Sequence, residues 1–350
     1  MRRVALICPG RGTYTRSELG ILTRADRPDP SGLRRDLVAR ADRWRGRIGR
    51  TSISDLDGAD RFGSVHLKGE NAAALIYTAG AVDVASLAKD LEVVCVCGNS
   101  MGWYTALHAG GVFGFDDGLR LADTMGGFQV EDGVVGGQVI VSIVDDEWRK
   151  DPVLANAVDG AVQQVSRDGH RAFPSIELGG YRVLAGDPDG VRLLLQSLPK
   201  RQVGEREYPF QLLGHSAFHT PLMEPTSRRA YEALADLEWR SPSVSVIDGR
   251  GHVFRPLTTA PDQLRDYTLG HQVTQAYDFT TSLRVALREF APDALVLLGP
   301  GDTLGGAIGM TLVEEGWSGI RSKADFVARQ KSQDPIVFAM GRPEQRAAVV

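Results

Sequence analysis

Residues 93–110, VVCVCGNSMGWYTALHAG, place an apolar β-branched run, a Gly-x-Ser-x-Gly pentapeptide and a helical pattern in direct succession. This order predicts a buried strand, a sharp turn at Ser100 and a helix that starts just after it. Small residues flank the serine of a nucleophile elbow because the turn leaves no room for larger ones. We therefore predict that Ser100 lies on such an elbow, where the backbone N–H of Met101 can stabilise an oxyanion.

The rest of the chain alternates strand-like and helix-like segments. Short apolar runs typical of buried strands lie at residues 4–8, 93–97 and 294–298, and helical spacing is found at 70–90 and 106–128. Strands that alternate with helices in this way predict an α/β fold with a mostly parallel sheet.

A second, smaller unit is predicted after residue 130. Strand-like pieces at 139–144, 172–178 and 181–185 and a helix at 190–198 indicate a small α+β subdomain inserted into the larger one. The predicted division is 1–130 and 206–318 for the large α/β domain, 131–205 for the small subdomain, and 319–350 for a C-terminal tail.

Composition narrows the classes of partner. The 350 residues carry a formal net charge of -4, which gives no electrostatic reason to expect nucleic acid or a membrane as a partner. No apolar stretch is long enough to span a bilayer, and the three cysteines lack the spacing of a zinc site or a disulfide framework. We expect a cytoplasmic protein with no metal and no cofactor.

One segment has an uneven charge. Residues 11–50 hold eleven arginines against five acids. This pattern is typical of a solvated helical face, and it would also suit an anionic group such as a coenzyme phosphate.

A serine nucleophile needs a base, and two histidines lie in a suitable segment. His215 and His219 belong to GHSAFHTPLMEP, residues 214–225, a compact polar and aromatic turn that leads into an apparent helix. Catalytic groups collect in loops of this kind. Spacing alone does not choose between the two histidines.

Four blocks in the same order resemble the malonyl-CoA:acyl carrier protein transacylase family, which includes the acyltransferase domains of polyketide synthases. Residues 8–12, CPGRG, resemble the family's Phe-Pro-Gly-Gln-Gly start, and 98–107, GNSMGWYTAL, its Gly-His-Ser-Leu-Gly-Glu-Tyr block. Residues 217–223, AFHTPLM, are similar to its Ala-Phe-His-Ser-Pro-Leu-Met block, and 298–301, LGPG, to its Gly-Pro-Gly turn.

The resemblance implies a Ser–His dyad and a ping-pong acyl transfer. Ser100 would take an acyl group from acyl-CoA, with His219 as general base and then general acid, and the phosphopantetheine thiol of an acyl carrier protein would collect it. A backbone carbonyl between Gln275 and Asp278 would orient His219, with Asp278 also available as a carboxylate. His215 would be a pocket residue. The implied fold is a hydrolase-like domain with an inserted ferredoxin-like subdomain and the active site between them.

The sequence departs from the family in the pocket. Met125 stands where malonyl-selective members carry the arginine that binds the substrate carboxylate, so we expect a non-malonyl acyl group. Arg11 replaces the glutamine that helps form the oxyanion hole, and we expect its side chain to face the oxyanion or a substrate carboxylate. Asn99 and Trp103 replace the histidine and glutamate near the nucleophile. With Phe218, these two residues are expected to bind the substrate.

Three other functions remain open at this level. A hydrolase that strips acyl groups from carrier proteins would use the same dyad with water as the acceptor. A catalytically silent protein that binds carrier proteins is compatible with the changes at Arg11 and Asn99, although Ser100 and His219 are retained. A simple lipase or esterase would need an Asp or Glu between Ser100 and His219 in chain order.

Overall fold

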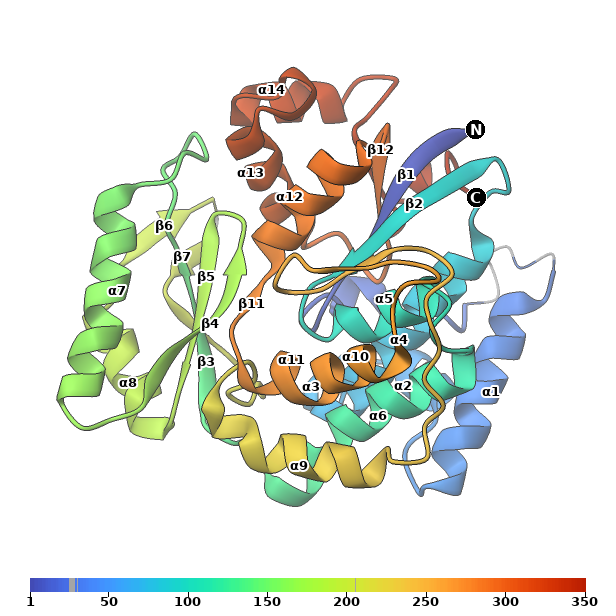
Figure 1. The fold of residues 1–350 in the computed structure, drawn as a ribbon, viewed down its shortest axis with the longest axis horizontal. Coiled ribbons are helices and arrows are strands. Elements are labelled where there is room, and N and C mark those ends of the chain that lie inside the picture. Colours follow the sequence, from blue (N-terminus) through green and yellow to red (C-terminus); the bar gives the residue numbers. More distant parts are fainter. Residues whose placement is uncertain (25–28, 30, 205) are drawn as a thin grey trace.

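The strand at the start of the chain and the strand before Ser100 lie side by side in the middle of a six-stranded sheet (Figure 1). The computed structural model describes residues 1–24, 29, 31–204 and 206–350. In spatial order the strands are β10 (Val253–Phe254), β9 (Val246–Ile247), β2 (Leu91–Gly98), β1 (Arg2–Cys8), β12 (Ala294–Leu297) and β13 (Val337–Ala339). Neighbours are parallel except β9 and β10. The predicted α/β fold is confirmed.

Helices cover both faces of this sheet, because successive side chains of a buried parallel strand point to opposite sides. Along β1, Val4, Leu6 and Cys8 belong to one core cluster, and Ala5 and Ile7 belong to another. The helices with side chains in the first cluster are α1 (Leu33–Arg47), α2 (Ile53–Asp57), α4 (Gly69–Ser86), α5 (Gly102–Ala109), α6 (Phe115–Asp132), α9 (Glu224–Ala233), α10 (Pro261–Asp266) and α11 (Gln272–Thr274). Those of the second cluster are α12 (Phe279–Phe290) and α13 (Gly305–Glu315), with α14 (Lys323–Gln330) packed against it.

The helical pattern expected over residues 106–128 is divided between two helices. Helix α5 ends at Ala109 and α6 begins at Phe115. Gly111 lies between them with φ 77°, a left-handed conformation that glycine adopts without steric penalty. The chain therefore turns before it starts α6.

The inserted unit has the chain order β3 (Gly137–Ser142), α7 (Pro152–Arg167), β4 (Ala172–Leu178), β5 (Tyr181–Gly186), α8 (Pro188–Ser197) and β8 (Phe210–Leu212). Its sheet has the antiparallel order β4-β5-β3-β8, which with the two helices is the ferredoxin-like arrangement. Helices α7 and α8 pack on one face of the sheet through a separate apolar cluster. A hairpin of β6 (Arg201–Val203) and β7 (Arg206–Tyr208) precedes β8. Figure 1 shows this unit beside the large domain.

Some strands lie outside the parts to which the sequence assigned them. Strand β8 follows residue 205 and still belongs to the small sheet, and β11 (Tyr277–Asp278) joins that sheet beside β4. Strand β13 lies within residues 319–350 and extends the large sheet, with Val337 and Phe338 buried. These strands are only two or three residues long, too short to give a periodic signal in the sequence. The overall division into domains stays a prediction.

A buried ion pair holds helices α1, α4 and α6 together. Arg45 of α1 and Asp123 of α6 are both fully buried, with Nη1 of the arginine 2.5 Å from the carboxylate. Arg45 also donates to the side-chain oxygen of Asn71 in α4. Arg40 of the same helix pairs with Asp116 at the start of α6. The arginine-rich segment thus serves in part to hold three helices together, although its residues 25–28 and 30 lie outside the described part of the chain.

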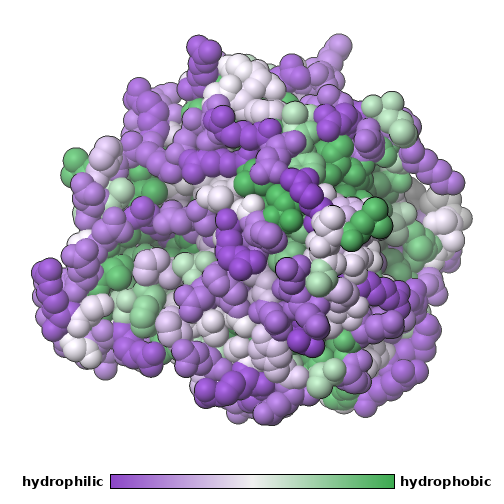
Figure 2. Space-filling model, viewed as in Figure 1, coloured by the Kyte–Doolittle hydropathy of each residue, from purple (hydrophilic) through white to green (hydrophobic). Residues whose placement is uncertain are grey.

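The surface is largely polar (Figure 2), as expected for a chain of modest net charge and hydrophobic content. Most of the face shown in Figure 2 is hydrophilic. Within the described residues, no helix combines the length and the apolar character needed to cross a bilayer.

Candidate active site

Ser100 lies on a strand–turn–helix, between the end of β2 at Gly98 and the start of α5 at Gly102. Its φ is 53°, a left-handed conformation that is strained for a residue with a side chain and that recurs at functional sites. Both glycines are required by contact: a Cβ at Gly98 would lie 2.4 Å from the carbonyl oxygen of Gly102, and one at Gly102 would lie 2.1 Å from the carbonyl oxygen of Cys8. The turn has the geometry expected of a nucleophile elbow.

The histidine that meets the serine is His219. Its Nε2 lies 2.8 Å from Ser100 Oγ, and its Nδ1 lies 2.5 Å from the backbone oxygen of Gln272. A carbonyl only accepts, so Nδ1 carries the proton and Nε2 is left with the lone pair that can accept from the serine hydroxyl. Like the serine, His219 has a positive φ, of 64°.

Burial keeps this base neutral. His219 is almost fully buried, and the loss of hydration lowers its pKa to about 4, although the bond to the Gln272 carbonyl favours the charged form. The imidazole therefore remains available as a proton acceptor throughout the neutral range.

The orienting carbonyl belongs to Gln272, which corrects the expectation for the segment from Gln275 to Asp278. Asp278 caps α12 instead and accepts from the backbone N–H of Thr281 at 2.7 Å. The chain leaves helix α11 at Gln275, so the carbonyl of Gln272 has no partner four residues ahead in the helix and is free to accept from His219. The side chain of Gln272 donates to the backbone oxygen of Ser100 at 3.2 Å, so this residue contacts both members of the pair.

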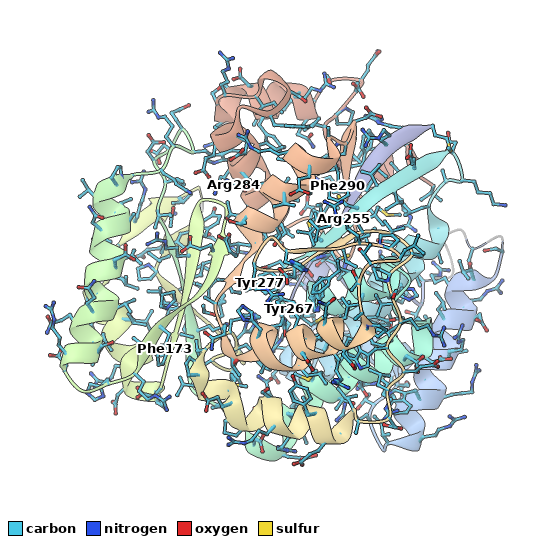
Figure 3. All side chains as sticks on the ribbon, viewed as in Figure 1. Phe173, Arg255, Tyr267, Tyr277, Arg284 and Phe290 are labelled. Carbon is cyan, nitrogen blue, oxygen red and sulfur yellow. The ribbon has the colours of Figure 1, made fainter. Side chains whose placement is uncertain are left out.

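Tyr277 contacts both the elbow and His219, which the sequence did not predict. Its hydroxyl donates to the backbone oxygen of Gly98 at 2.6 Å, and its ring centroid lies 5.3 Å from that of His219. In Figure 3 Tyr277 and Tyr267 lie in the centre of the molecule, beside the small subdomain. Tyr277 belongs to the segment that was expected to orient the histidine, and it contacts His219 through its ring.

Ser100 lines a cavity of about 710 Å³ that lies against the small sheet, a volume typical of a site for a small molecule. One part of its wall is apolar and comes from the small sheet and α13: Ile140, Ile176, Leu178, Val183, Leu304 and Ala307. Around Ser100 the wall contains five residues that the sequence had proposed: Asn99, Met101, Met125, His215 and Phe218. Burial, aided by the charge of Arg11, lowers the pKa of His215 well below its usual range, so this histidine is also neutral.

The expected role of Trp103 is wrong, and Arg11 has hydrogen-bond partners that the sequence did not predict. Trp103 is fully buried in the core, where its Nε1 donates to Thr268 Oγ1 at 2.8 Å, and it is not among the residues that line the cavity. Arg11 lines the cavity, but its Nη2 donates to the backbone oxygens of Leu67 at 2.8 Å and Gly214 at 3.0 Å. Its guanidinium is therefore held by main-chain carbonyls. In the described residues, no group of His, Cys, Asp and Glu side chains is arranged to bind a metal.

Comparison with known proteins adds to this geometry. No family model matches the sequence. The chain is 27% identical over 242 residues to the polyketide synthase GfsB of Streptomyces halstedii. The matched region covers 67% of this chain and 4% of that protein. It is 24% identical over 212 residues to the malonyl CoA-acyl carrier protein transacylase of Bacillus subtilis. Here the matched region covers 60% of this chain and 62% of the relative. The matches thus span less than two thirds of the length of these curated relatives.

A solved structure shares the fold. The malonyl-CoA:ACP transacylase of Synechocystis sp. PCC 6803 superposes with a TM-score of 0.73 at 18% identity, over 100% of both chains. The chain thus shares the α/β fold of that structure, and its elbow places a serine in hydrogen-bond contact with a histidine. In sequence it is distantly related to malonyl-CoA:acyl carrier protein transacylases and to the acyltransferase domains of polyketide synthases.

The low pKa of His219 predicts the acid limit of serine reactivity. Labelling of Ser100 by a fluorophosphonate needs neutral Nε2, so its rate should stay level from pH 8 to about pH 5 and fall by half near pH 4. The rate is measured by intact mass against time, with Ser100→Ala as the unlabelled control. A half-point near 6.5, the ordinary histidine value, would contradict the burial of His219.

Removing the Tyr277 hydroxyl should affect both the elbow and stability. Tyr277→Phe loses the bond to Gly98 and should lower the free energy of unfolding by about 1 kcal/mol and slow fluorophosphonate labelling of Ser100 about fivefold. The matched control is Tyr231→Phe, whose hydroxyl donates to the exposed carbonyl of Asp266 at 3.3 Å. Equal labelling rates in Tyr277→Phe and the unmodified protein would show that the phenol does not position the serine.

Proposed function

We propose that the protein is an acyltransferase that moves an acyl group from acyl-CoA to the phosphopantetheine thiol of an acyl carrier protein. The observation that carries this proposal is the 2.8 Å contact between Ser100 Oγ and the neutral Nε2 of His219, at the wall of a large cavity, in a chain of the transacylase family. The curated relative from Bacillus subtilis bears the name of a malonyl CoA-acyl carrier protein transacylase, and this activity comes to the present chain as a proposal.

In the first half-reaction, Ser100 Oγ attacks the thioester carbonyl while His219 Nε2 takes the hydroxyl proton. The carbonyl oxygen becomes an oxyanion that faces the N–H of Met101, at the start of α5, where backbone N–H groups have no partner within the helix. The tetrahedral intermediate then breaks its C–S bond. The coenzyme A thiolate leaves with the proton from His219, and the acyl group stays on Ser100.

In the second half-reaction the carrier thiol gives its proton to His219 and its sulfur attacks the acyl-enzyme. The ester bond to Ser100 Oγ breaks, and the same proton returns to the serine. Water in place of the thiol gives free acid instead, so an acyl carrier protein hydrolase would need no other residue.

We further propose a monocarboxylic acyl group. Met125 is 2% exposed, lines the cavity and offers a thioether where malonyl-selective relatives offer an arginine. A carboxylate next to it would be desolvated without a bidentate partner. The nearby guanidinium of Arg11 is already bonded to the Leu67 and Gly214 carbonyls.

Incubation with a panel of acyl-CoAs should leave an acyl mass on Ser100. Acetyl to octanoyl and benzoyl donors should label the protein faster than malonyl-CoA, Ser100→Ala should take no label, and His219→Ala should be slower by about 10²–10⁴-fold. Addition of holo carrier protein should discharge the adduct faster than water does, as intact mass of both proteins reports. Discharge to free acid alone would favour the hydrolase, and no adduct from any donor would reject an acyl-enzyme.

Met125→Arg should restore binding of a carboxylate. Malonyl loading of Ser100 should rise by about 10–100-fold over the unmodified protein, the range expected for one charge-assisted hydrogen-bonded pair. Met125→Leu keeps the wall apolar and should give no gain. Rapid malonyl loading of the unmodified protein would overturn this account of Met125.

A further inference from the structure

One guanidinium links several segments of the cavity wall. Arg11, in the loop after β1, donates from Nη2 to the backbone oxygens of Leu67, at the end of α3 (Ser64–Leu67), and Gly214, in the loop after β8. Its Nη1 lies 3.3 Å from the side-chain amide of Gln129 in α6, and that amide lies 2.7 Å from Ser216 Oγ. Two loops of the large domain, helix α6 and the segment that returns from the small sheet therefore meet at one side chain.

The segments that Arg11 joins carry apolar side chains at the cavity. Leu67 and Leu213 both line it while remaining 38% and 72% exposed, so they lie at its edge. Arg11 donates to the carbonyl of Leu67 and to the carbonyl of Gly214, the residue after Leu213. The guanidinium thus holds two apolar segments of the rim close to each other.

The same wall continues to Met125. Met125 and Gln129 are four residues apart on α6 and share one face of the helix, and both line the cavity. Helix α4 closes the space behind them, since a Cβ at Gly69 would lie 2.7 Å from the carbonyl oxygen of Gly126. An acyl chain that leaves Ser100 along Met125 would therefore meet Gln129 and Arg11.

Two of the three guanidinium nitrogens of Arg11 are not available to an anion. Nη2 is committed to two carbonyls, and Nε is buried without a hydrogen-bond partner among the described residues. Burial lowers the pKa of Arg11 to about 10, which still leaves it charged at neutral pH, so the bonds to both carbonyls persist under ordinary conditions. The role of this arginine is to join wall segments.

We propose that Arg11 is a specificity-determining residue that closes the rim of the cavity between Leu67 and Leu213 and limits the length of acyl chain that fits. This inference rests on the proposed acyltransferase function. It assigns to the side chain a steric role, in place of the oxyanion or carboxylate contact expected from the sequence.

The test compares Arg11→Ala and Arg11→Gln with Arg16→Ala, which changes an exposed arginine at the start of the short 3-10 helix Arg16–Glu18. Ser100 loading is measured with acetyl-, butyryl-, hexanoyl-, octanoyl-, dodecanoyl- and malonyl-CoA. Both Arg11 variants should raise the ratio of kcat/KM for dodecanoyl over butyryl at least tenfold, and Arg16→Ala should leave it unchanged. An unchanged ratio in folded Arg11 variants, verified by thermal melting, would overturn the proposal. Selective loss of malonyl loading would overturn it in favour of a carboxylate contact.

Binding provides a second measurement that does not need turnover. Unreactive butyl and dodecyl thioethers of coenzyme A are titrated calorimetrically into Ser100→Ala and into Ser100→Ala combined with Arg11→Ala or Arg11→Gln. The dodecyl ligand should gain at least tenfold in affinity relative to the butyl ligand when Arg11 is removed. A gain without any acyl adduct in the unmodified protein would reject the acyltransferase and retain the length limit, whereas equal ratios would reject the length limit alone.

Discussion

The site depends on the close approach of two backbone segments that only glycine permits. A Cβ at Gly102 would lie 2.1 Å from the oxygen of Cys8, and one at Gly10 would lie 2.4 Å from the oxygen of Asn99. No side chain fits at such distances. The loop after β1 and the turn after β2 can therefore touch only because Gly10 and Gly102 have no side chain. That contact brings Ser100 and Arg11 to the wall of the same cavity.

Around this contact, the chain keeps its polar groups neutral or bonded to main chain. His219 and His215 are uncharged because burial penalises their protonated forms, and the charge of Arg11 faces two carbonyls. The buried ion pair of Arg45 and Asp123 lies behind α6, away from Met125 on that helix. These features support the proposal that the acyl group is uncharged.

The local sequence was sufficient to predict the fold and the pairing of Ser100 with His219. It was not sufficient to predict the contacts that the neighbouring side chains make. The elbow is predictable because its strand, glycines and helix are consecutive, and His219 because it lies in a recognisable block. The contacts of Gln272 and Tyr277 depend on where a helix ends and where a two-residue strand pairs. The position of Trp103 was predicted wrongly because a residue three positions after the serine can point into the core, and the partners of Arg11 were not predicted because they lie 56 and 203 residues away in the chain.

Strand β11 gives the two domains a mechanical linkage. Tyr277 pairs with Ile176 of β4, whose side chain lines the cavity, while the Tyr277 hydroxyl holds the first glycine of the elbow. A force that displaces β4 therefore acts on Gly98 through one strand pair and one hydrogen bond. The position of the small sheet, which lines the cavity, and the position of the turn that carries Ser100 are therefore coupled through a single residue, Tyr277.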